Sequence, residues 1–148
     1  MLIEIGQKAK ETSYVLGKMG TNLKNAGLLA AAQEILDEEN EILKANAADV
    51  ERAKERGMAP GLVDRLELNH KRIEGIVEGM RQVVGLEDPV GEVISMKRRP
   101  NGLLIGQKRV PFGVIGIIYE ARPNVTADAF ALCFKTGNAV ILRGGSDA

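Results

Sequence analysis

Polar and glycine residues that could form a ligand site follow two short apolar stretches near the end of the chain. They are Glu120, Arg122 and Asn124 after residues 113–119, and Arg143, Gly144, Gly145 and Ser146 after residues 139–142. Glycines let backbone N–H groups approach a phosphate, and an arginine adds positive charge. The second group has neither the G-x-x-x-x-G-K-[ST] nor the G-x-G-x-x-G spacing, so it fits a phosphate loop and a plain turn equally well.

The loop after residue 119 leaves two interpretations open. Glu120 and Arg122 can pair with each other as a structural ion pair, which the residues alone slightly favour, or Arg122 can face an anionic substrate. Pro123 disfavours helix at the residue before it, so we expect the loop to stay extended until a helix begins.

Two other residue types that often do chemistry are rare in this chain. The one cysteine, Cys133, lies among Ala131, Leu132 and Phe134, so we expect a buried, inert thiol rather than a nucleophile. The one histidine, His70, lies in a charged helix, and we expect it to be exposed. A single His and a single Cys are too few for a zinc site, so we expect no metal.

A βαβ unit is the element that must position the two polar loops. Residues 113–119 form a continuous apolar run rich in β-branched residues, which is typical of a strand buried on both faces of a parallel sheet. A helix follows, with Thr126 as its expected cap and Gly137 at its end, and residues 139–142 form a second strand. Ligands bind α/β sheets at the carboxyl ends of such strands, where both loops would lie.

The preceding residues predict a hairpin and a helical segment. Residues 91–112 form two extended stretches around Asn101-Gly102, which favours a type I′ turn. Lys97, Arg98 and Arg99 beside that turn are either a phosphate patch or, as we favour, a solvated hairpin end.

Residues 1–90 have helical periodicity, interrupted by a Gly- and Pro-containing break at 56–65. We expect Thr21 and Asn69 to cap helices, and Gly85 to end the second one. The apolar face expected for the first of these helices comprises Leu23, Ala26, Ala30, Ile35 and Ile42.

Composition narrows the classes of partner. The 148 residues carry 20 basic and 20 acidic side chains, so no net charge favours nucleic acid or an anionic membrane. Three Phe, two Tyr and no Trp give no base-stacking platform. No apolar run approaches the roughly 20 residues of a membrane span, and no secretory signal is visible. With one cysteine there is no internal disulfide, so we expect a cytoplasmic protein.

The stretch "KRVPFGVIGIIYEARPNVTADAFALCFKTGNAVILRGG" closely resembles the γ-glutamyl phosphate reductase (glutamate-5-semialdehyde dehydrogenase) family of the aldehyde dehydrogenase superfamily. "YEARPNVTADA" is its most specific piece, and the resemblance extends along the whole chain. It implies an α/β fold in three parts: amino-terminal helices (1–90), an oligomerisation-type β-hairpin (91–112) and the start of a Rossmann-type NADP-binding βαβ domain (113–148).

The resemblance also implies an activity. The family reduces L-glutamate 5-phosphate to L-glutamate 5-semialdehyde and phosphate with NADPH, in proline biosynthesis, through a cysteine thioester. That cysteine lies farther along the family's sequence in a catalytic domain. We therefore expect that domain to be absent here, no catalytic residue in this chain, and no activity of the chain alone. The family implies a homo-oligomer and glutamate 5-kinase as partners; the alternative is a non-catalytic module that binds a nucleotide or a partner.

Single positions follow from the same resemblance. Tyr119 matches the nicotinamide and acyl site, and Arg122 falls where ordinary aldehyde dehydrogenases place an oxyanion-stabilising Asn. Arg143 matches a lysine that contacts the adenosine ribose, and Ser146 falls where NAD-preferring relatives carry a Glu. Ser beside Arg would accept a 2′-phosphate, so we expect NADP(H). The expected cofactor residues are Tyr119, Arg143, Gly144 and Ser146, and the expected substrate residues are Arg122 and Asn124.

Overall fold

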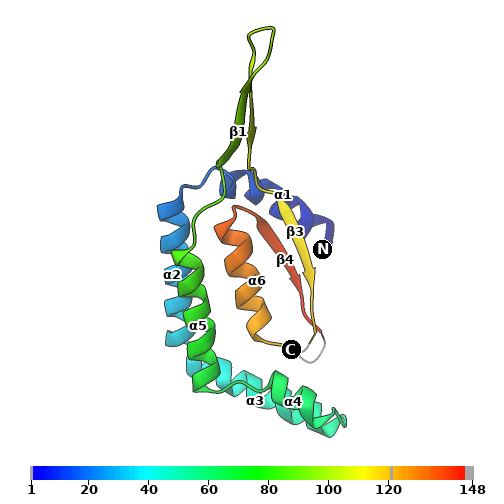
Figure 1. Cartoon of the computed structure of the whole chain (residues 1–148). Helices are drawn as coiled ribbons and strands as arrows, with labels where there is room; N and C mark the ends of the chain where they lie inside the picture. The colour runs from blue at the N-terminus through cyan, green and yellow to red at the C-terminus, as the bar shows by residue number, and fades with distance from the viewer. Residues whose placement is uncertain (1, 121, 146–148) are drawn as a thin grey trace.

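The computed structural model describes residues 2–120 and 122–145 and has an α/β fold (Figure 1). The helices are α1 (Leu2–Leu16), α2 (Thr21–Asp37), α3 (Glu39–Glu55), α4 (Pro60–Leu66), α5 (His70–Gly85) and α6 (Asn124–Lys135). The strands are β1 (Val93–Arg98), β2 (Leu104–Lys108), β3 (Val114–Ile118) and β4 (Ala139–Arg143). Among the described residues, no helix combines the length and apolar character that crossing a bilayer requires.

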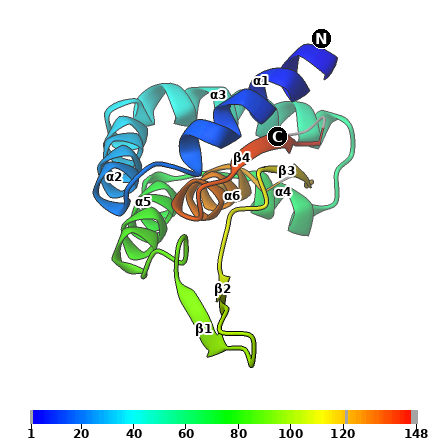
Figure 2. The same ribbon diagram turned by 90° about the horizontal axis from the view of Figure 1, so that it is seen from above.

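The predicted βαβ unit is present as β3, α6 and β4. The two strands are parallel, with Val114 opposite Ala139 and Ile118 opposite Arg143. Figure 2 shows α1 on one side of this sheet and α6 on the other, and both helices contact β4. The described part of the sheet has two strands, so β3 is only half covered and Ile118 is 87% exposed. The expectation of a strand buried on both faces was therefore wrong for β3.

The predicted end of α6 was correct, but its predicted start was wrong. Gly137 has a φ of 73°, and Asn138 N–H donates to the Cys133 carbonyl at 2.8 Å, so the glycine ends the helix as expected. The start was mispredicted because the chain enters the helix directly after Pro123, whose fixed φ suits a first turn. Thr126 is inside the helix, and its hydroxyl is 2.6 Å from the Tyr119 hydroxyl.

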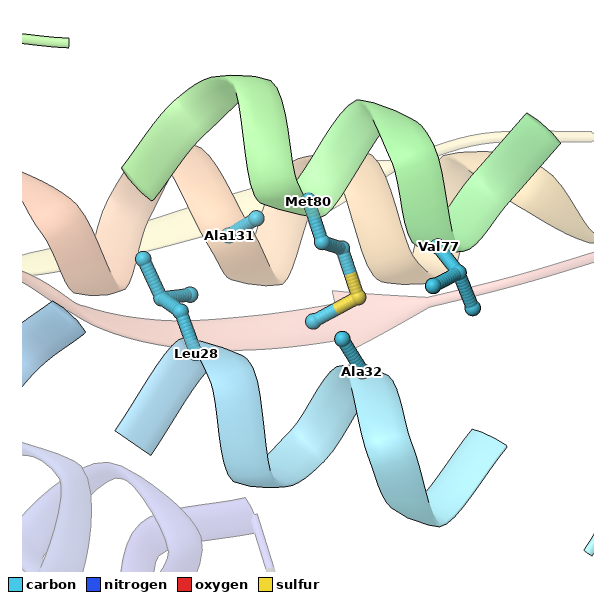
Figure 3. Packing of buried hydrophobic residues seen from close by; sticks show 5 residues of the cluster. All are labelled: Leu28, Ala32, Val77, Met80 and Ala131. Atoms are coloured by element: carbon cyan, nitrogen blue, oxygen red, sulfur yellow. The ribbon is translucent and has the colours of Figure 1, made fainter. Parts of the chain in front are cut away.

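The main core joins the helical segment to the βαβ unit. Figure 3 shows the buried residues Leu28 and Ala32 of α2, Val77 and Met80 of α5, and Ala131 of α6. In that view Met80 reaches from α5 towards Ala32. Packing of one helix of the βαβ unit against two earlier helices fixes the position of the sheet.

The buried face of α2 was predicted only in part, because Ile35 packs against the main core but other expected residues do not. Leu23 is 62% exposed, and Ala26 and Ala30 are also exposed. Leu28 and Ala32 are buried instead, together with Lys24 at 0% exposure. Because α2 has apolar residues on most of its faces, its periodicity does not identify one face.

Buried cations bridge α2, α5 and α6. The Lys24 ammonium forms an ion pair with Asp88, in the connection after α5. The same carboxylate accepts hydrogen bonds from the Thr21 hydroxyl at 2.8 Å and the Val90 N–H at 3.0 Å. Thr21 is therefore the first residue of α2 and binds Asp88, in place of the expected helix cap.

Lys135, at the end of α6, is 2% exposed. Its ammonium donates to the Asn25 side chain at 2.7 Å and to the Val84 carbonyl at 2.9 Å. Burial lowers the pKa of Lys135. These bonds attach the last turn of α6 to both α2 and α5.

A second, smaller core lies between α3 and α4. Val50 and Ala53 pack against Val63 and Leu66. The predicted interruption of helix at residues 56–65 is therefore shorter than expected. The chain turns at Gly57, whose φ is 75°, and then forms α4 from Pro60 onwards.

The connection from α4 to α5 is fixed by two asparagines. The buried Asn46 side chain donates to the Leu66 carbonyl at 2.9 Å and accepts from the Leu68 N–H at 2.7 Å. Asn69 caps α5 as predicted, with its side chain accepting from the Arg72 N–H at 2.9 Å.

The hairpin of β1 and β2 projects from one end of the molecule, and α3 and α4 lie at the opposite end (Figure 1). The antiparallel pairing was predicted, but the type I′ turn was not correct. Gly102 has a φ of 87°, its N–H donates to the Arg99 carbonyl at 2.9 Å, and no described non-glycine residue has a positive φ. Pro100 explains the difference because its ring requires a negative φ at the second turn position.

Candidate functional site

The two polar loops meet at the carboxyl ends of β3 and β4, as the βαβ topology requires. Tyr119 N–H donates to the Arg143 carbonyl at 3.1 Å. A Cβ placed on Gly145 would be 3.7 Å from the Glu120 Cα, so the loops pass directly beside one another. The sequence therefore located the place where these loops come together.

Of the residues expected to bind the cofactor, Tyr119, Arg143 and Gly144 lie at this edge. The Tyr119 hydroxyl is held by Thr126, and the exposed Arg143 guanidinium donates to the Gly144 carbonyl at 2.7 Å. An exposed arginine beside two glycines at strand ends fits the phosphates of a dinucleotide. Ser146 lies outside the described residues.

The residues expected to bind the substrate face a different hollow. Arg122 and Asn124 line a cleft of about 490 Å³ between the start of α6 and the α4–α5 connection. Arg122 N–H donates to the Glu120 carbonyl at 2.8 Å. Within residues 2–120 and 122–145, no ion pair joins the Glu120 and Arg122 side chains, so the structural ion pair that the residues alone slightly favoured is not formed.

Sequence reasoning missed the opposite wall of this cleft. Its charged members are Arg65, Glu67 and Arg72, and Asp128 lies on the α6 side. Arg72 donates to the carbonyls of Asp64 and Glu67 and to the Asp64 carboxylate, so it fastens α4 to α5. No local pattern indicates these residues, because the cleft forms only when α5 packs on α6.

The one cysteine, Cys133, and the one histidine, His70, are not among the residues that line this cleft. Cys133 is 6% exposed in α6, and burial raises the pKa of its thiol, so the nucleophilic thiolate is disfavoured as expected. His70 is exposed, with Nδ1 2.6 Å from Glu39 Oε1 and Nε2 3.2 Å from Glu74 Oε1. The hydrogen bond to Glu39 and the two negative charges raise the pKa of His70. The described residues contain no group of three or more His, Cys, Asp or Glu side chains that could hold a metal ion.

Comparisons with curated proteins and with solved structures both find γ-glutamyl phosphate reductases. No protein-family model matches the chain. A γ-glutamyl phosphate reductase of Halothermothrix orenii is 60% identical over 142 residues, which are 96% of this chain and 34% of that protein. The crystal structure of the Thermotoga maritima γ-glutamyl phosphate reductase superposes with a TM-score of 0.96 at 49% identity, covering 99% of this chain and 36% of that one.

The Saccharomyces cerevisiae γ-glutamyl phosphate reductase gives a TM-score of 0.92 at 34% identity, covering 97% of this chain and 37% of that one. The chain thus spans about a third of the length of the relatives it matches. Over the length that it spans, the chain is similar in sequence and in fold to γ-glutamyl phosphate reductases.

Proposed function

We propose that this chain serves as the amino-terminal part of an oxidoreductase of proline biosynthesis. The reaction is the NADPH-dependent reduction of L-glutamate 5-phosphate to L-glutamate 5-semialdehyde and phosphate. The observation that carries this proposal is the match to γ-glutamyl phosphate reductases over almost the whole chain, at 60% identity. The geometry supports it, since the exposed Arg143 ends β4 beside the loop that follows β3, and Arg122 in that loop lines a cleft.

The cofactor of this proposal is NADP(H), which supplies the hydride. Tyr119, Arg143 and Gly144 would hold it at the ends of β3 and β4. The exposed Arg143 offers positive charge for a 2′-phosphate, and Ser146 is a residue type that does not repel one. Residues 113–148 are then the start of the NADP-binding domain.

The role of this chain is binding rather than nucleophilic attack. Cys133 is buried in α6, and its raised pKa disfavours the thiolate that a thioester mechanism requires. Arg122 and Asn124 contribute to the substrate site from the loop before α6. The nucleophilic cysteine comes from outside these 148 residues.

The hairpin and the compartment belong to the same proposal. Val93, Ile94, Met96, Leu104 and Ile105 are each about half exposed on β1 and β2. An extended hairpin with this many exposed apolar residues suits contact with a second copy of the chain.

We place the protein in the cytoplasm, where a kinase that phosphorylates the glutamate side chain would supply the substrate.

A chimera tests the proposed function. This chain replaces the matching third of the Halothermothrix orenii reductase, and the assay follows phosphate-dependent NADP⁺ reduction with glutamate semialdehyde. We expect activity comparable to that of the parent. A correctly folded chimera without activity would contradict the proposal, and it would leave the non-catalytic binding module as the function of this chain.

The same chimera tests the cofactor site. Losing a charged hydrogen bond to the 2′-phosphate costs about 1.5–3 kcal/mol, so Arg143→Ala should weaken NADP⁺ binding by roughly 10- to 100-fold. NAD⁺ binding should change little. Arg81→Ala removes a positive charge from the exposed surface of α5 and is the matched control. Equal losses for the two cofactors would refute the assignment of Arg143.

A further inference from the structure

The cleft beside α6 has two walls of different origin. One wall is the α4–α5 connection with the start of α5, and the other is the loop after β3 with the first turns of α6. Its lining residues are Arg65, Glu67, Leu68, Arg72, Gly75, Ile76, Arg122, Pro123, Asn124 and Asp128. The volume of about 490 Å³ lies within the range of about 300–1,000 Å³ that is usual for small-molecule sites.

Glycines on α5 keep the cleft open. Gly75 lines it, and no atom lies within 4 Å of the position that a Cβ on Gly75 would occupy. A Cβ on Gly79, one turn later, would be 3.8 Å from Asp128 Oδ1. A larger side chain at position 75 would therefore extend into free space between the two walls.

The arginines of the cleft differ in whether other residues of the described chain already bind their guanidinium groups. Arg72 is bound to the end of α4 through three hydrogen bonds. In contrast, the guanidinium groups of Arg65 and Arg122 have no hydrogen bond or ion pair with other residues of the described chain. These two cations are available to an anionic ligand.

Asp128 is an exposed carboxylate with one hydrogen-bond donor among the described residues. Its Oδ2 accepts a hydrogen bond from the Asn124 side chain at 3.0 Å, and its Oδ1 faces the bare backbone at Gly79. A carboxylate accepts several hydrogen bonds, so one donor leaves capacity for a ligand. A purely anionic ligand would be repelled by Asp128, whereas a ligand that also carries an ammonium group would be attracted.

We propose that this cleft selects the α-amino-acid end of the substrate. Arg65 binds the α-carboxylate from one wall, and Asp128 binds the α-ammonium from the other. Arg122, closest in sequence to the end of β3, is left for the phosphorylated end. This inference rests on the proposed function, in which the substrate is an α-amino acid phosphorylated on its side-chain carboxyl. It adds Arg65 and Asp128 as specificity-determining residues.

Three small ligands distinguish the groups that are recognised. L-Glutamate carries both the α-carboxylate and the α-ammonium, glutarate lacks the ammonium, and 4-aminobutyrate lacks the α-carboxylate. Each is titrated into the ¹⁵N-labelled 148-residue chain, and the backbone amide shifts are followed by NMR. We expect shifts in residues 65–76 and 122–128, with L-glutamate binding at least about tenfold more tightly than either analogue because each lost charge pair is worth about one such factor.

Variants assign each wall to one ligand group. Arg65→Gln should weaken L-glutamate and glutarate by about tenfold each. Asp128→Asn should weaken L-glutamate by a similar factor and leave glutarate unchanged or tighter. The matched controls are Arg81→Gln, outside the cleft, and Glu67→Gln, a second carboxylate on its lining. Both should stay within about twofold of the parent chain, well below the tenfold effect of a lost charge pair.

Gly75→Leu tests the location without changing charge. The substitution favours helix and fills the cleft, so all three ligands should lose binding while the far-UV circular dichroism stays the same. Absence of shifts with millimolar L-glutamate would overturn the inference. A loss in Glu67→Gln equal to that in Asp128→Asn would overturn the assignment to Asp128.

The binding readout separates this inference from the proposed function. If the chain binds L-glutamate as described and the chimera is inactive, only the proposed function fails. If the chimera is active and neither Arg65→Gln nor Asp128→Asn changes its KM for glutamate semialdehyde, only this inference fails.

Discussion

The buried ion pair between Lys24 and Asp88 allows a quantitative test of what holds α2 against the end of α5. The Lys24 side chain has no exposed surface, and that of Asp88 is 10% exposed. Asp88→Asn would leave the ammonium buried without a counter-charge. Removing one partner of a buried pair costs about 3–5 kcal/mol, and the small exposure of Asp88 places our expectation near the lower end, at about 3 kcal/mol.

Lys24→Met is the informative counterpart. The methionine side chain fills a similar space without charge, and Asp88 keeps its hydrogen bonds from Thr21 and Val90 and some contact with water. We therefore expect a loss of about 1 kcal/mol or less. The two variants should differ because a buried ammonium has no access to water, whereas the carboxylate retains other donors.

Urea unfolding of the 148-residue chain, followed by far-UV circular dichroism, measures this difference. With a slope of about 2 kcal/mol per M, a loss of 3 kcal/mol lowers the midpoint by about 1.5 M. The shift for Lys24→Met should be about a third of that. A smaller shift for Asp88→Asn than for Lys24→Met would refute the reasoning, because the buried charge would then not need its partner.

The pH dependence provides an independent check. Burial alone would raise the pKa of Asp88, but hydrogen bonds from Lys24, Val90 and Thr21 outweigh it and lower the pKa below its usual 3.8. A carboxyl group with a lowered pKa stabilises the fold above its unfolded value. That contribution is lost as the pH falls through the lowered value. The stability difference between the parent and Asp88→Asn should thus shrink below about pH 4.

Three further predictions concern separate parts of the molecule. The hydrogen bond and charge of Glu39 raise the pKa of His70 above 6.5. At a pH below 6.5, His70→Gln should therefore unfold at a lower urea concentration than the parent chain. This difference should vanish as the pH rises through the raised pKa. Cys133 should react slowly with a maleimide in the native chain and rapidly in urea, and fast native labelling would contradict its burial. Gly137→Ala should cost about 1–2 kcal/mol in urea unfolding because its φ is 73° and the new Cβ would be 3.0 Å from the Pro111 ring; an unchanged midpoint would show that the turn relaxes.

Local signals in the sequence were sufficient for much of the fold. Asn69 and Gly137 were correctly assigned to a helix start and a helix end because capping and positive φ depend on neighbouring backbone alone. The β-branched run before Tyr119 was correctly assigned to a parallel strand. Its half-covered state could not be predicted, because burial depends on how many strands and helices assemble around it.

Errors arose where several local solutions compete. The helix from Thr21 to Asp37 has apolar residues on most sides, so Leu23 and Leu28 were equally plausible core residues until α5 and α6 were placed. A lysine in the core, such as Lys24, runs against the usual burial preferences. Around Asn101-Gly102 the hairpin was correct, but the influence of Pro100 on the turn type was overlooked.

One part of the candidate site could likewise be predicted from the sequence, and another part could not. Tyr119 and Arg143 follow consecutive strands of one βαβ unit, so topology alone brings them together. Arg65 and Asp128 share a cleft only because α5 packs against α6, and no spacing in the sequence encodes that contact. The roles assigned to Tyr119, Arg122, Asn124, Arg143, Gly144 and Ser146 stay predictions.

The core that joins α2, α5 and α6 has a consequence for the order in which the chain folds during synthesis. Leu28 and Met80 pack against Ala131, which the ribosome adds much later. At about 5–20 residues per second, the interval between Met80 and Ala131 lasts roughly 3 to 10 seconds. During this time the apolar faces of α2 and α5 lack the helix that covers them. Before α6 is made, a chaperone would therefore bind these uncovered faces of α2 and α5, and premature aggregation would begin at them.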